Sequence, residues 1–577
     1  MKNISLLKNI LKAQKIDYFV LPNSDEFFLE YLPQNQKRIE FISGFSGSNA
    51  VIIFGQKNSQ FFTDGRYILQ SKNELDLKEF SIIDMAEMSV LAWLRDNLKK
   101  SQKIAIDSKL MSINFVFELE KIVGKIGAKL EFVEQNPVDE VWKNRAKKTP
   151  SEIFSHPLKY AGASFEAKIS EVAKGLESDA LFLSNSESIC WLLNIRAADT
   201  EYSPLLASYA ILYKTGQIDV FVGEGAKIKG KYAANINFVK SDNIIIKNSI
   251  NSIEIDANLT NYFVYKMFQD KKVNVILKNN PILIKKAVKN KTEIKNAVKA
   301  HEIDGLAVVR FLFWLENSLK KGERIDELSA EEKLLEFRQK NKNFVYPSFR
   351  SISGFSSNGA IIHYHSSKKT NKILKGNSLY LIDSGGQYFQ GTTDITRTVA
   401  VGEPKPEMIH NFTLVLKGHI ALAMAKFDEK TTGDKLDLLA RQFLLEQGKD
   451  YAHGTGHGVG SFLCVHEGPV SISKKAFKHT FKAGMVLSNE PGFYQENEYG
   501  IRIENLVLIN KIKASLVFET LTLAPIDYKL INFKLLTKEE KKWLNNYHKK
   551  IFLLLNSKLK PAEKAWLALI CKVYKNN

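Results

Sequence analysis

Histidine residues gather in one part of this 577-residue chain, where carboxylates and glycines surround them. Seven of the 11 histidines fall between His363 and His466, a window of less than a fifth of the sequence. Histidine binds metal ions and transfers protons near neutral pH, so this window is a candidate for catalytic chemistry. The residue types beside these histidines indicate which chemistry it would be.

Two aspartates, Asp383 and Asp394, stand eleven residues apart in the segment YLIDSGGQYFQGTTDITRT. The segment predicts a strand, a tight turn at Gly385-Gly386 and a returning strand, which would bring the two carboxylates together. Carboxylates held close repel one another unless cations lie between them. Either aspartate alone would more often be a turn residue beside glycine.

The segment HGTGHGVG supplies His453 and His457, and His466 follows it. Glycine at alternate positions lets the backbone and a ligand approach each other closely. Because the small residues around these histidines cannot form a hydrophobic core, a buried structural role explains them poorly. They are therefore candidates for metal binding or for contact with a substrate.

Two glutamates follow further along the chain. Glu490 lies at the end of an apolar strand that Pro491 stops. Arg502 and Glu504 alternate with two isoleucines, so the arginine and the glutamate point to the same face of a strand. If this pair stood alone, a solvated ion pair would explain it.

Taken together, five residues form a plausible set of metal ligands: Asp383, Asp394, His457, Glu490 and Glu504. Four carboxylates and one imidazole favour hard divalent ions such as Mn²⁺ over a zinc ion bound by thiolates. The four negative charges match two divalent cations. Two neighbouring metal ions that share a hydroxide are a known arrangement for hydrolysis.

The order of these motifs resembles that of the pita-bread metallopeptidases, which include methionine aminopeptidase, prolidase and aminopeptidase P. All five ligand positions of that family are present. The whole chain is similar to the long, three-domain form of aminopeptidase P, the Xaa-Pro aminopeptidases. The similar stretches are GFSGSNA, TDGRY, HPLKYAG, WLLNIR, SGFSSNGAIIHY, GTTDITRT, HGTGHGVG, NEPGFY and GIRIEN.

The resemblance implies a role for each ligand. Asp383 would bind one metal ion through both oxygens, and Asp394 and Glu504 would bridge the two ions. His457 and Glu490 would complete the other site, and Glu490 would also take the proton as the bridging water attacks the peptide carbonyl. The implied cofactors are two divalent metal ions, with Mn²⁺ as the first expectation and Co²⁺ or Zn²⁺ as alternatives.

The resemblance also implies catalytic roles for three histidines. His363 would help proton transfer near the substrate amine and carbonyl. His453 and His466 would orient the peptide and stabilise the tetrahedral oxyanion, which needs a donor aimed at it. Arg502 and Tyr494 would form a second layer that holds the ligand carboxylates.

The scaffold implied by the resemblance is a combination of α/β and α+β folds. Two creatinase-like N-terminal α/β domains would precede a pita-bread catalytic domain with a helical C-terminal tail. We expect the boundaries 1–147, 148–288, 289–525 and 526–577. The two N-terminal segments look like copies of one plan, helix, strand, loop, strand and helix. Apolar residues at helical spacing predict a long helix over residues 293–320.

The expected reaction is hydrolysis of the bond between the first residue of a peptide and a proline at the second position. No spacing in this sequence reveals a proline pocket, so that preference rests on the resemblance. Prolidase, which cleaves only Xaa-Pro dipeptides, is the alternative, and methionine aminopeptidase fits less well because of the long N-terminal part. A non-catalytic pita-bread protein that binds histones or nucleic acid is another alternative, although such relatives usually lose metal ligands.

Composition excludes several classes of protein. With 44% hydrophobic and 25% charged residues, the chain is neither disordered nor collagen-like nor a coiled coil. Its net charge of +19 is carried mostly by lysine, because only 12 of the 82 basic residues are arginine. The lysine pairs are dispersed along the chain, whereas a nucleic-acid footprint would be clustered and rich in arginine. We therefore expect no nucleic-acid partner.

The cysteines and the apolar segments indicate the compartment. Cys190, Cys464 and Cys571 include no CxxC pair, which argues against a disulfide framework and fits a reducing environment. No apolar run approaches the roughly 18 residues that a membrane span needs. The N-terminus predicts an amphipathic helix that leads into a strand rather than a signal peptide. We expect a cytoplasmic protein without a membrane partner, and a homodimer, both by resemblance and because two-fold dimers are the commonest oligomers.

Overall fold

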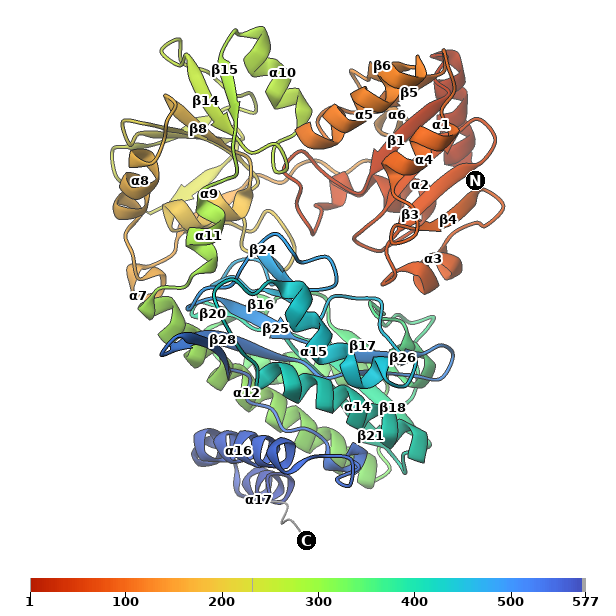
Figure 1. Cartoon of the computed structure of the whole chain (residues 1–577), viewed down its shortest axis with the longest axis vertical. Helices are drawn as coiled ribbons and strands as arrows, with labels where there is room; N and C mark the ends of the chain where they lie inside the picture. The colour runs from red at the N-terminus through yellow and green to blue at the C-terminus, as the bar shows by residue number, and fades with distance from the viewer. Residues whose placement is uncertain (1, 231, 573–577) are drawn as a thin grey trace. The chain divides into compact units, whose positions relative to one another are not determined.

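The computed structural model describes residues 2–230 and 232–572 (Figure 1). Contacts divide the chain into two compact units. The first comprises Met1–Pro157 with Ala163–Ile282, and the second comprises Leu158–Gly162 with Leu283–Asn577. Helix α11 (Ile282–Ala287) leads from one unit into the other. Among the described residues, no helix has the length and apolarity needed to cross a membrane.

The first unit begins with a six-stranded sheet in the order β4-β3-β2-β1-β5-β6. Its strands are β1 (Tyr18–Pro22), β2 (Val51–Gly55), β3 (Ser59–Thr63), β4 (Phe80–Asp84), β5 (Lys103–Ile106) and β6 (Lys129–Phe132). The helices of this part are α1 (Lys2–Ala13), α2 (Arg38–Ser43), α3 (Ile68–Glu74), α4 (Val90–Asn97), α5 (Ile113–Ile126) and α6 (Pro137–Val141).

A second six-stranded sheet follows in the same unit, in the order β13-β11-β10-β8-β14-β15. Its strands are β8 (Ala180–Leu183), β10 (Tyr209–Tyr213), β11 (Ile218–Val222), β13 (Ile236–Lys240), β14 (Ser252–Ile255) and β15 (Asn274–Leu277). A small sheet joins β7 (Glu152–Ser155), β9 (Ile195–Arg196) and β12 (Lys227–Lys229). The helices are α8 (Phe165–Lys174), α9 (Ser186–Leu193) and α10 (Tyr262–Asp270).

These two large sheets have one topology. When the strands of each are numbered in chain order, both sheets have the spatial order 4-3-2-1-5-6. In each sheet the first strand pairs antiparallel with the second and parallel with the fifth. The third and fourth strands are parallel in both. The predicted repetition of one plan in the N-terminal part is therefore confirmed.

The second unit is built around long helices and several sheets. Helix α12 (Lys291–Lys320) begins at a capping box in which the Asn290 side chain accepts from the backbone of Glu293 and Glu293 bonds back. It confirms the long helix predicted from the periodicity. The other helices of this part are α7 (Leu158–Ala161), α13 (Glu327–Gln339), α14 (Pro406–Ala423) and α15 (Gly433–Leu445).

The sheets of the second unit supply the strands on which the predicted site residues lie. The largest has the order β22-β29-β28-β25-β23-β24, with β22 (Lys426–Phe427), β23 (Gly456–Gly458), β24 (Glu467–Ile472), β25 (Val486–Asn489), β28 (Asn505–Ile512) and β29 (Ser515–Thr520). Three smaller sheets contain β16 (Phe344–Pro347), β17 (Ile352–Phe355), β18 (Ser378–Ser384), β19 (Gly386–Tyr388), β20 (Gly391–Thr392), β21 (Ile395–Val401), β26 (Gly492–Gln495) and β27 (Tyr499–Arg502).

The turn predicted at Gly385-Gly386 is wrong, although the pairing it implied is right. Strands β18 and β21 are antiparallel partners, with Asp383 opposite Thr396. Between them the chain forms a second, shorter hairpin, β19 and β20, in a different sheet. A side chain at Gly385 would lie only 2.0 Å from the Thr393 carbonyl oxygen, so glycine here lets the chain pass closely from one sheet to the next.

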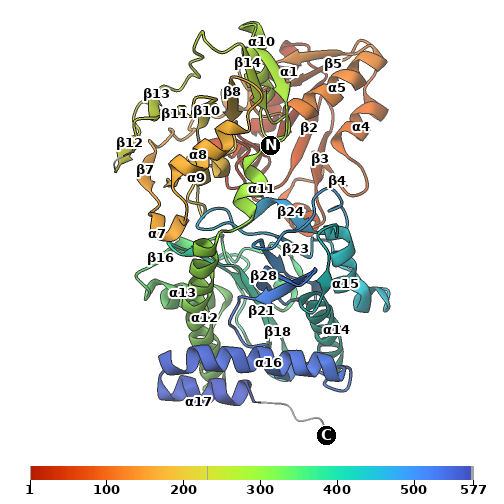
Figure 2. The ribbon, with the colours of Figure 1, turned by 60° about the vertical axis from the view of Figure 1, so that its left-hand side comes forward.

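The predicted helical tail is present in the part of the chain that the structure describes. It consists of α16 (Lys538–Leu555) and α17 (Pro561–Ile570), while residues 573–577 of the expected tail lie outside the described residues. Helix α16 packs across α12 and α14 (Figure 2). Its buried face, with Leu544, Tyr547 and Ile551, joins the large hydrophobic cluster of α14 and β27.

Candidate metal centre

The five predicted metal ligands come from strands and strand ends of the second unit. Asp383 lies in β18, and Asp394 directly precedes its partner strand β21. His457 lies in β23, and Glu490 follows the neighbouring strand β25. Glu504 stands between β27 and β28, where its backbone N–H donates to the Thr396 carbonyl oxygen at 3.2 Å. Strand pairing therefore brings residues far apart in sequence to one place.

Ligand atoms of these residues form three overlapping groups, in each of which the atoms lie within 4.8 Å of one another. The groups are Asp383 with Asp394 and Glu504, His457 with Glu490 and Glu504, and Asp394 with His457 and His466. Glu504, Asp394 and His457 each belong to two groups. The structure thus brings together all five predicted ligands, with His466 beside them, and the shared carboxylates suit a pair of cations.

The imidazole of His457 is oriented by the backbone. Its Nδ1 lies 2.9 Å from the Gly458 carbonyl oxygen, which can only accept, so Nδ1 carries the proton. The other nitrogen, Nε2, faces Asp394 Oδ2 at 3.5 Å and Glu490 Oε1 at 3.4 Å. A carbonyl that fixes the tautomer in this way is a common partner of histidine ligands.

The electrostatics of the metal-free cluster favour bound cations. Burial raises the pKa of Asp383 to about 6, although Arg502 opposes this shift. Burial and the neighbouring carboxylates also raise the pKa of Glu490 and, much further, of Glu504. Burial disfavours a charged His457, but the Asp394 and Glu490 carboxylates outweigh it and raise its pKa to about 9. Without metal ions the cluster therefore retains protons, and divalent cations would neutralise its negative charge better.

One buried carboxylate oxygen provides a direct test of fit to a metal ion. Asp383 Oδ1 is buried and accepts no hydrogen bond from the described residues, whereas Oδ2 accepts from Arg502 Nη2 at 2.6 Å. Buried carboxylate oxygens without a partner are costly. Asp383 belongs to the group formed with Asp394 and Glu504, so an oxygen-seeking divalent cation held by these three residues would satisfy it.

Arg502 contacts the ligand carboxylate of Asp383, whereas the hydroxyl of Tyr494 bonds to Arg502 and His453. Arg502 Nη1 donates to the Tyr494 hydroxyl at 2.6 Å, and this hydroxyl lies 2.8 Å from His453 Nε2. His453 Nδ1 faces the Gly454 carbonyl oxygen at 2.8 Å and must carry the proton, so Tyr494 donates to Nε2. Burial raises the pKa of Tyr494 to about 12, which keeps it a donor.

The contacts of His466 and His363 define their positions less closely than those of His453 do. The His466 ring meets the His457 ring edge to face, with their centres 4.5 Å apart. His363 is half-buried in the segment after β17. Its neighbours Ile361 and Tyr364 pack in a small cluster that also contacts Tyr494. The segment of His363 therefore borders the residues that support the site.

Two hydroxyl residues at the site escaped the sequence analysis. Thr396 Oγ1 donates to Glu504 Oε2 at 2.9 Å and accepts from Arg502 Nε at 3.1 Å. Ser488 Oγ donates to Glu490 Oε1 at 3.2 Å and accepts from the His457 backbone N–H at 3.0 Å. Each stands two positions from a ligand, Asp394 or Glu490. The alternation that placed Arg502 and Glu504 on one face would have identified both.

The loop that carries His453 is held by Arg441 of α15, which the sequence analysis also missed. Arg441 donates to the Tyr451 carbonyl oxygen at 2.7 Å and to the His453 carbonyl oxygen at 2.6 Å. Its Nε pairs with Asp437 one turn earlier at 2.7 Å. Two bonds from one buried guanidinium to backbone carbonyls thus fix a loop whose glycines would otherwise leave it flexible.

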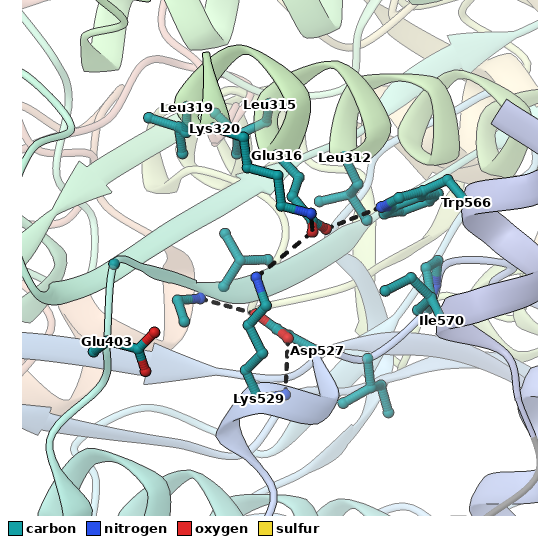
Figure 3. A pocket seen from close by; sticks show the side chains of 15 residues that line it. Leu312, Leu315, Glu316, Leu319, Lys320, Glu403, Asp527, Lys529, Trp566 and Ile570 are labelled. Carbon is teal, nitrogen blue, oxygen red and sulfur yellow. Dashed lines mark hydrogen bonds and ion pairs between the residues drawn. The ribbon is translucent and has the colours of Figure 1, made fainter. Parts of the chain in front are cut away.

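A cavity of about 330 Å³ lies elsewhere in the second unit, between α12, β21 and the C-terminal segment (Figure 3). None of the predicted site residues lines it. Several of its polar side chains have partners: Glu316 accepts from Trp566 Nε1 at 2.9 Å, and Asp527 accepts from the Ala400 backbone N–H at 3.0 Å. Lys320 and Lys529 pair with Glu316. Glu316, Lys320, Asp527 and Lys529 are therefore already paired.

Four family models together match most of the chain between residues 4 and 574. The model of metallopeptidase family M24 matches residues 295–511, and a model of the C-terminal region of peptidase M24 matches residues 514–574. Two models of the creatinase/prolidase N-terminal domain match residues 4–141 and 144–293.

Individual relatives are similar over nearly all of both chains. A probable Xaa-Pro aminopeptidase P of Paracoccidioides brasiliensis is 36% identical over 594 residues, covering 96% of this chain and 95% of its own. Xaa-Pro aminopeptidase 1 of Dictyostelium discoideum is 36% identical, covering 95% and 92%. The crystal structure of an X-prolyl aminopeptidase from Caenorhabditis elegans, described as a cytosolic enzyme with a di-nuclear active site, is 31% identical with a TM-score of 0.94, covering 99% of both chains.

Proposed function

We propose that this chain is a Xaa-Pro aminopeptidase, because it belongs to metallopeptidase family M24 and carries creatinase/prolidase N-terminal domains. It would hydrolyse the bond between the first residue of a peptide and a proline at the second position. The observation that carries the proposal is the convergence of Asp383, Asp394, His457, Glu490 and Glu504 in a chain that is similar to such enzymes over its whole length.

The five ligands would hold two divalent metal ions. Asp383, Asp394 and Glu504 would hold one ion, and His457 and Glu490, with the shared carboxylates, would hold the other. When bound, such ions lower the pKa of water and polarise the substrate carbonyl. The donor set of four carboxylates and one imidazole favours Mn²⁺, with Co²⁺ and Zn²⁺ as alternatives. The di-nuclear site described for the Caenorhabditis relative supports the number of ions.

Glu490 would move the proton in the proposed reaction. Its carboxylate lies at the edge of the cluster, half-buried, and Ser488 and His457 flank its Oε1. Burial raises its pKa, and a general base or acid works best when its pKa lies near the working pH. Glu490 would take a proton from the attacking water and deliver it to the leaving proline nitrogen.

The histidines would orient the peptide. His453 has its Nε2 occupied by Tyr494, and its ring lies 3.9 Å from Glu490, so it would position Glu490 and the peptide beside it. His466, against the His457 ring, would donate to the developing oxyanion. His363 would assist proton transfer at the substrate amine. Arg502 and Tyr494 would hold Asp383 and His453 in these positions.

Three further proposals concern the compartment, the oligomeric state and the domain boundaries. We place the protein in the cytosol, which is supported by the description of the Caenorhabditis relative as a cytosolic enzyme. We also expect a homodimer, since two-fold dimers are the commonest oligomers. The divisions 1–147, 148–288, 289–525 and 526–577 remain our proposed domains, with the last packed on the catalytic domain.

Peptide length separates the proposed activity from prolidase. The purified protein, loaded with Mn²⁺, should release the first residue from a Xaa-Pro-Yaa tripeptide and should act far more slowly on a matched Xaa-Ala-Yaa peptide. Cleavage of the Xaa-Pro dipeptide alone would instead establish a prolidase. If metal is bound but neither proline peptide is cleaved, the proposed function is wrong. The Asp394→Asn variant is the control that should lose all turnover.

A further inference from the structure

Arg397 is a buried cation directly behind the metal centre. It follows Thr396 in β21, and only 2% of its surface is exposed. No carboxylate of the described residues lies within ion-pair distance of its guanidinium, and burial lowers its pKa. A buried charge without an ionic partner is expensive, so hydrogen bonds must satisfy it.

All three nitrogens of this guanidinium donate hydrogen bonds. Toward the metal centre, Nη1 donates to the Glu504 carbonyl oxygen at 2.6 Å and to the Thr396 carbonyl oxygen at 2.8 Å. Toward the C-terminal part of the chain, Nε donates to the Pro525 carbonyl oxygen at 3.0 Å. Nη2 donates to the Ala524 carbonyl oxygen at 2.7 Å and to the Tyr547 hydroxyl at 2.8 Å.

The two backbone segments that Arg397 joins are those that also meet through their side chains. Thr396 Oγ1 donates to Glu504 Oε2, and the Glu504 backbone N–H donates to the Thr396 carbonyl oxygen. Arg397 therefore holds the backbones of Thr396 and Glu504, the two residues whose side chains also contact each other. A shift of either backbone would move the Glu504 carboxylate relative to Asp383 and Asp394, with which it shares a cation-sized space.

The C-terminal helices supply the rest of this network. Tyr547 of α16 is buried, and its hydroxyl contacts the Ala524 carbonyl oxygen at 2.8 Å and Asn505 Oδ1 at 3.1 Å. Asn505, which follows Glu504, also accepts from Arg397 Nη2 at 2.7 Å. Helix α16 thus reaches the residue next to a proposed metal ligand through one hydroxyl group.

We propose that Arg397 and Tyr547 are positioning residues for Glu504, so that the C-terminal helices complete the metal centre from behind. The inference rests on the proposed metal centre and goes beyond it, because it gives the segment after the catalytic sheet a part in metal binding. The positive charge of Arg397 also offsets part of the negative charge of the cluster, which Arg502 offsets from the other side.

The test compares two variants of the same helix. Tyr547→Phe removes the hydroxyl that contacts Arg397, Ala524 and Asn505, and it changes little volume. Lys550→Met is the matched control, because Lys550 donates from α16 to the Thr520 carbonyl oxygen at 2.7 Å without contacting Arg397. Both variants and the wild type are measured as full-length protein for Co²⁺ affinity, for the Co²⁺ visible absorption spectrum and for kcat and KM with a Xaa-Pro tripeptide.

We expect Tyr547→Phe to weaken Co²⁺ binding by about 10-fold and to change the spectrum, as loss of a group that supports a ligand commonly does. Its kcat should fall while KM changes little, and Lys550→Met should match the wild type in all readouts. Arg397→Lys, which keeps the charge but loses the planar fork, should lose more affinity than Tyr547→Phe. Equal Co²⁺ affinity and identical spectra for Tyr547→Phe and Lys550→Met would overturn the inference. Metal binding needs no substrate, so this comparison decides the inference even if Xaa-Pro peptides are not cleaved.

Discussion

Two hydroxyl groups donate hydrogen bonds to proposed ligand carboxylates of this protein and so restrict their orientation. Thr396 contacts Glu504 and Arg502, and Ser488 contacts Glu490 and the His457 backbone. Each hydroxyl donates to one carboxylate and accepts from a second site residue, so it links two members of the cluster. Ligand residues were predictable because their charges and spacing are distinctive, whereas threonine and serine are common in strands and carry no such mark.

The contribution of Thr396 can be measured by removing only its hydroxyl. Thr396→Val keeps the β-branched shape but leaves Glu504 Oε2 and Arg502 Nε without this partner. We expect metal affinity to fall by about 10–100-fold, as for other losses around metal ligands. Titration calorimetry with Mn²⁺ measures this affinity. Thr413→Val, at a buried threonine of α14, is the control, and an equal loss in both variants would show that the effect is general destabilisation.

The raised pKa values of the cluster predict that protons and metal ions compete. Metal ions bind carboxylates and imidazole in their deprotonated forms. The pKa of Asp383 is about 6 and that of His457 about 9 in the metal-free protein. Apparent metal affinity should therefore rise as the pH increases from 6 to 9, and binding at neutral pH should release protons. Calorimetry in buffers of different ionisation enthalpy measures this release, and a pH-independent affinity would contradict the account.

The same pKa shifts determine whether the stability of the metal-free protein rises or falls with pH. His457 has a folded pKa above its ordinary value of 6.5, so its contribution is fully present below pH 6.5 and is lost as the pH rises through 9. Asp383, an acid with a raised pKa, favours folding only while protonated, so it too costs stability as the pH rises from about 4 to 6. The melting temperature of the metal-free protein should fall, not rise, with increasing pH over this range.

At the scale of elements, regular helices and strands followed the sequence pattern, and irregular connections did not. The long helix α12 and the repeated plan of the first unit were predicted because periodicity reflects burial of one face. The passage from β18 to β19 was not, because its shape depends on the Thr393 carbonyl and Ser348, which lie close to Gly385 only in the folded chain. Local turn chemistry alone pointed to a simple hairpin there.

A substitution at this passage should disturb the metal centre. In Gly385→Ala the new methyl group would lie 2.0 Å from the Thr393 carbonyl oxygen and 2.1 Å from Ser348 Oγ, so the backbone between Asp383 and Asp394 must move. We expect a lower melting temperature and reduced metal content after purification. Gly124→Ala in α5, where a methyl group meets nothing within 4 Å, should be neutral or slightly stabilising. Normal metal content in Gly385→Ala would show that the passage does not position the ligands.

At the scale of the whole molecule, all the predicted ligands belong to one of the two compact units. Every one of the five lies between Leu283 and Asn577, and the first unit has its own sheets and hydrophobic clusters. The net charge of +19, which the sequence analysis did not attribute to a partner, contrasts with the acidic site. Composition could not reveal this contrast, because the four carboxylates are a small part of the total.

Removal of metal should therefore affect the two units differently. A ligand that binds only the folded state stabilises it by about 4 kcal/mol at a thousand times its dissociation constant. In calorimetric scans, a chelator should lower the transition of the second unit and leave that of the first unchanged. The signal can be assigned by following which tryptic fragments disappear first on heating. If neither transition moves, the cluster contributes no metal-linked stability.

The most direct test of the account is a titration of the metal-free protein with Mn²⁺, followed by electron paramagnetic resonance. We expect two ions to bind per chain and to give the spectrum of a spin-coupled pair, because Asp394 and Glu504 would be shared between them. Asp394→Asn should abolish the coupling. A single bound ion with an uncoupled spectrum in the wild type would contradict the proposed two-metal centre.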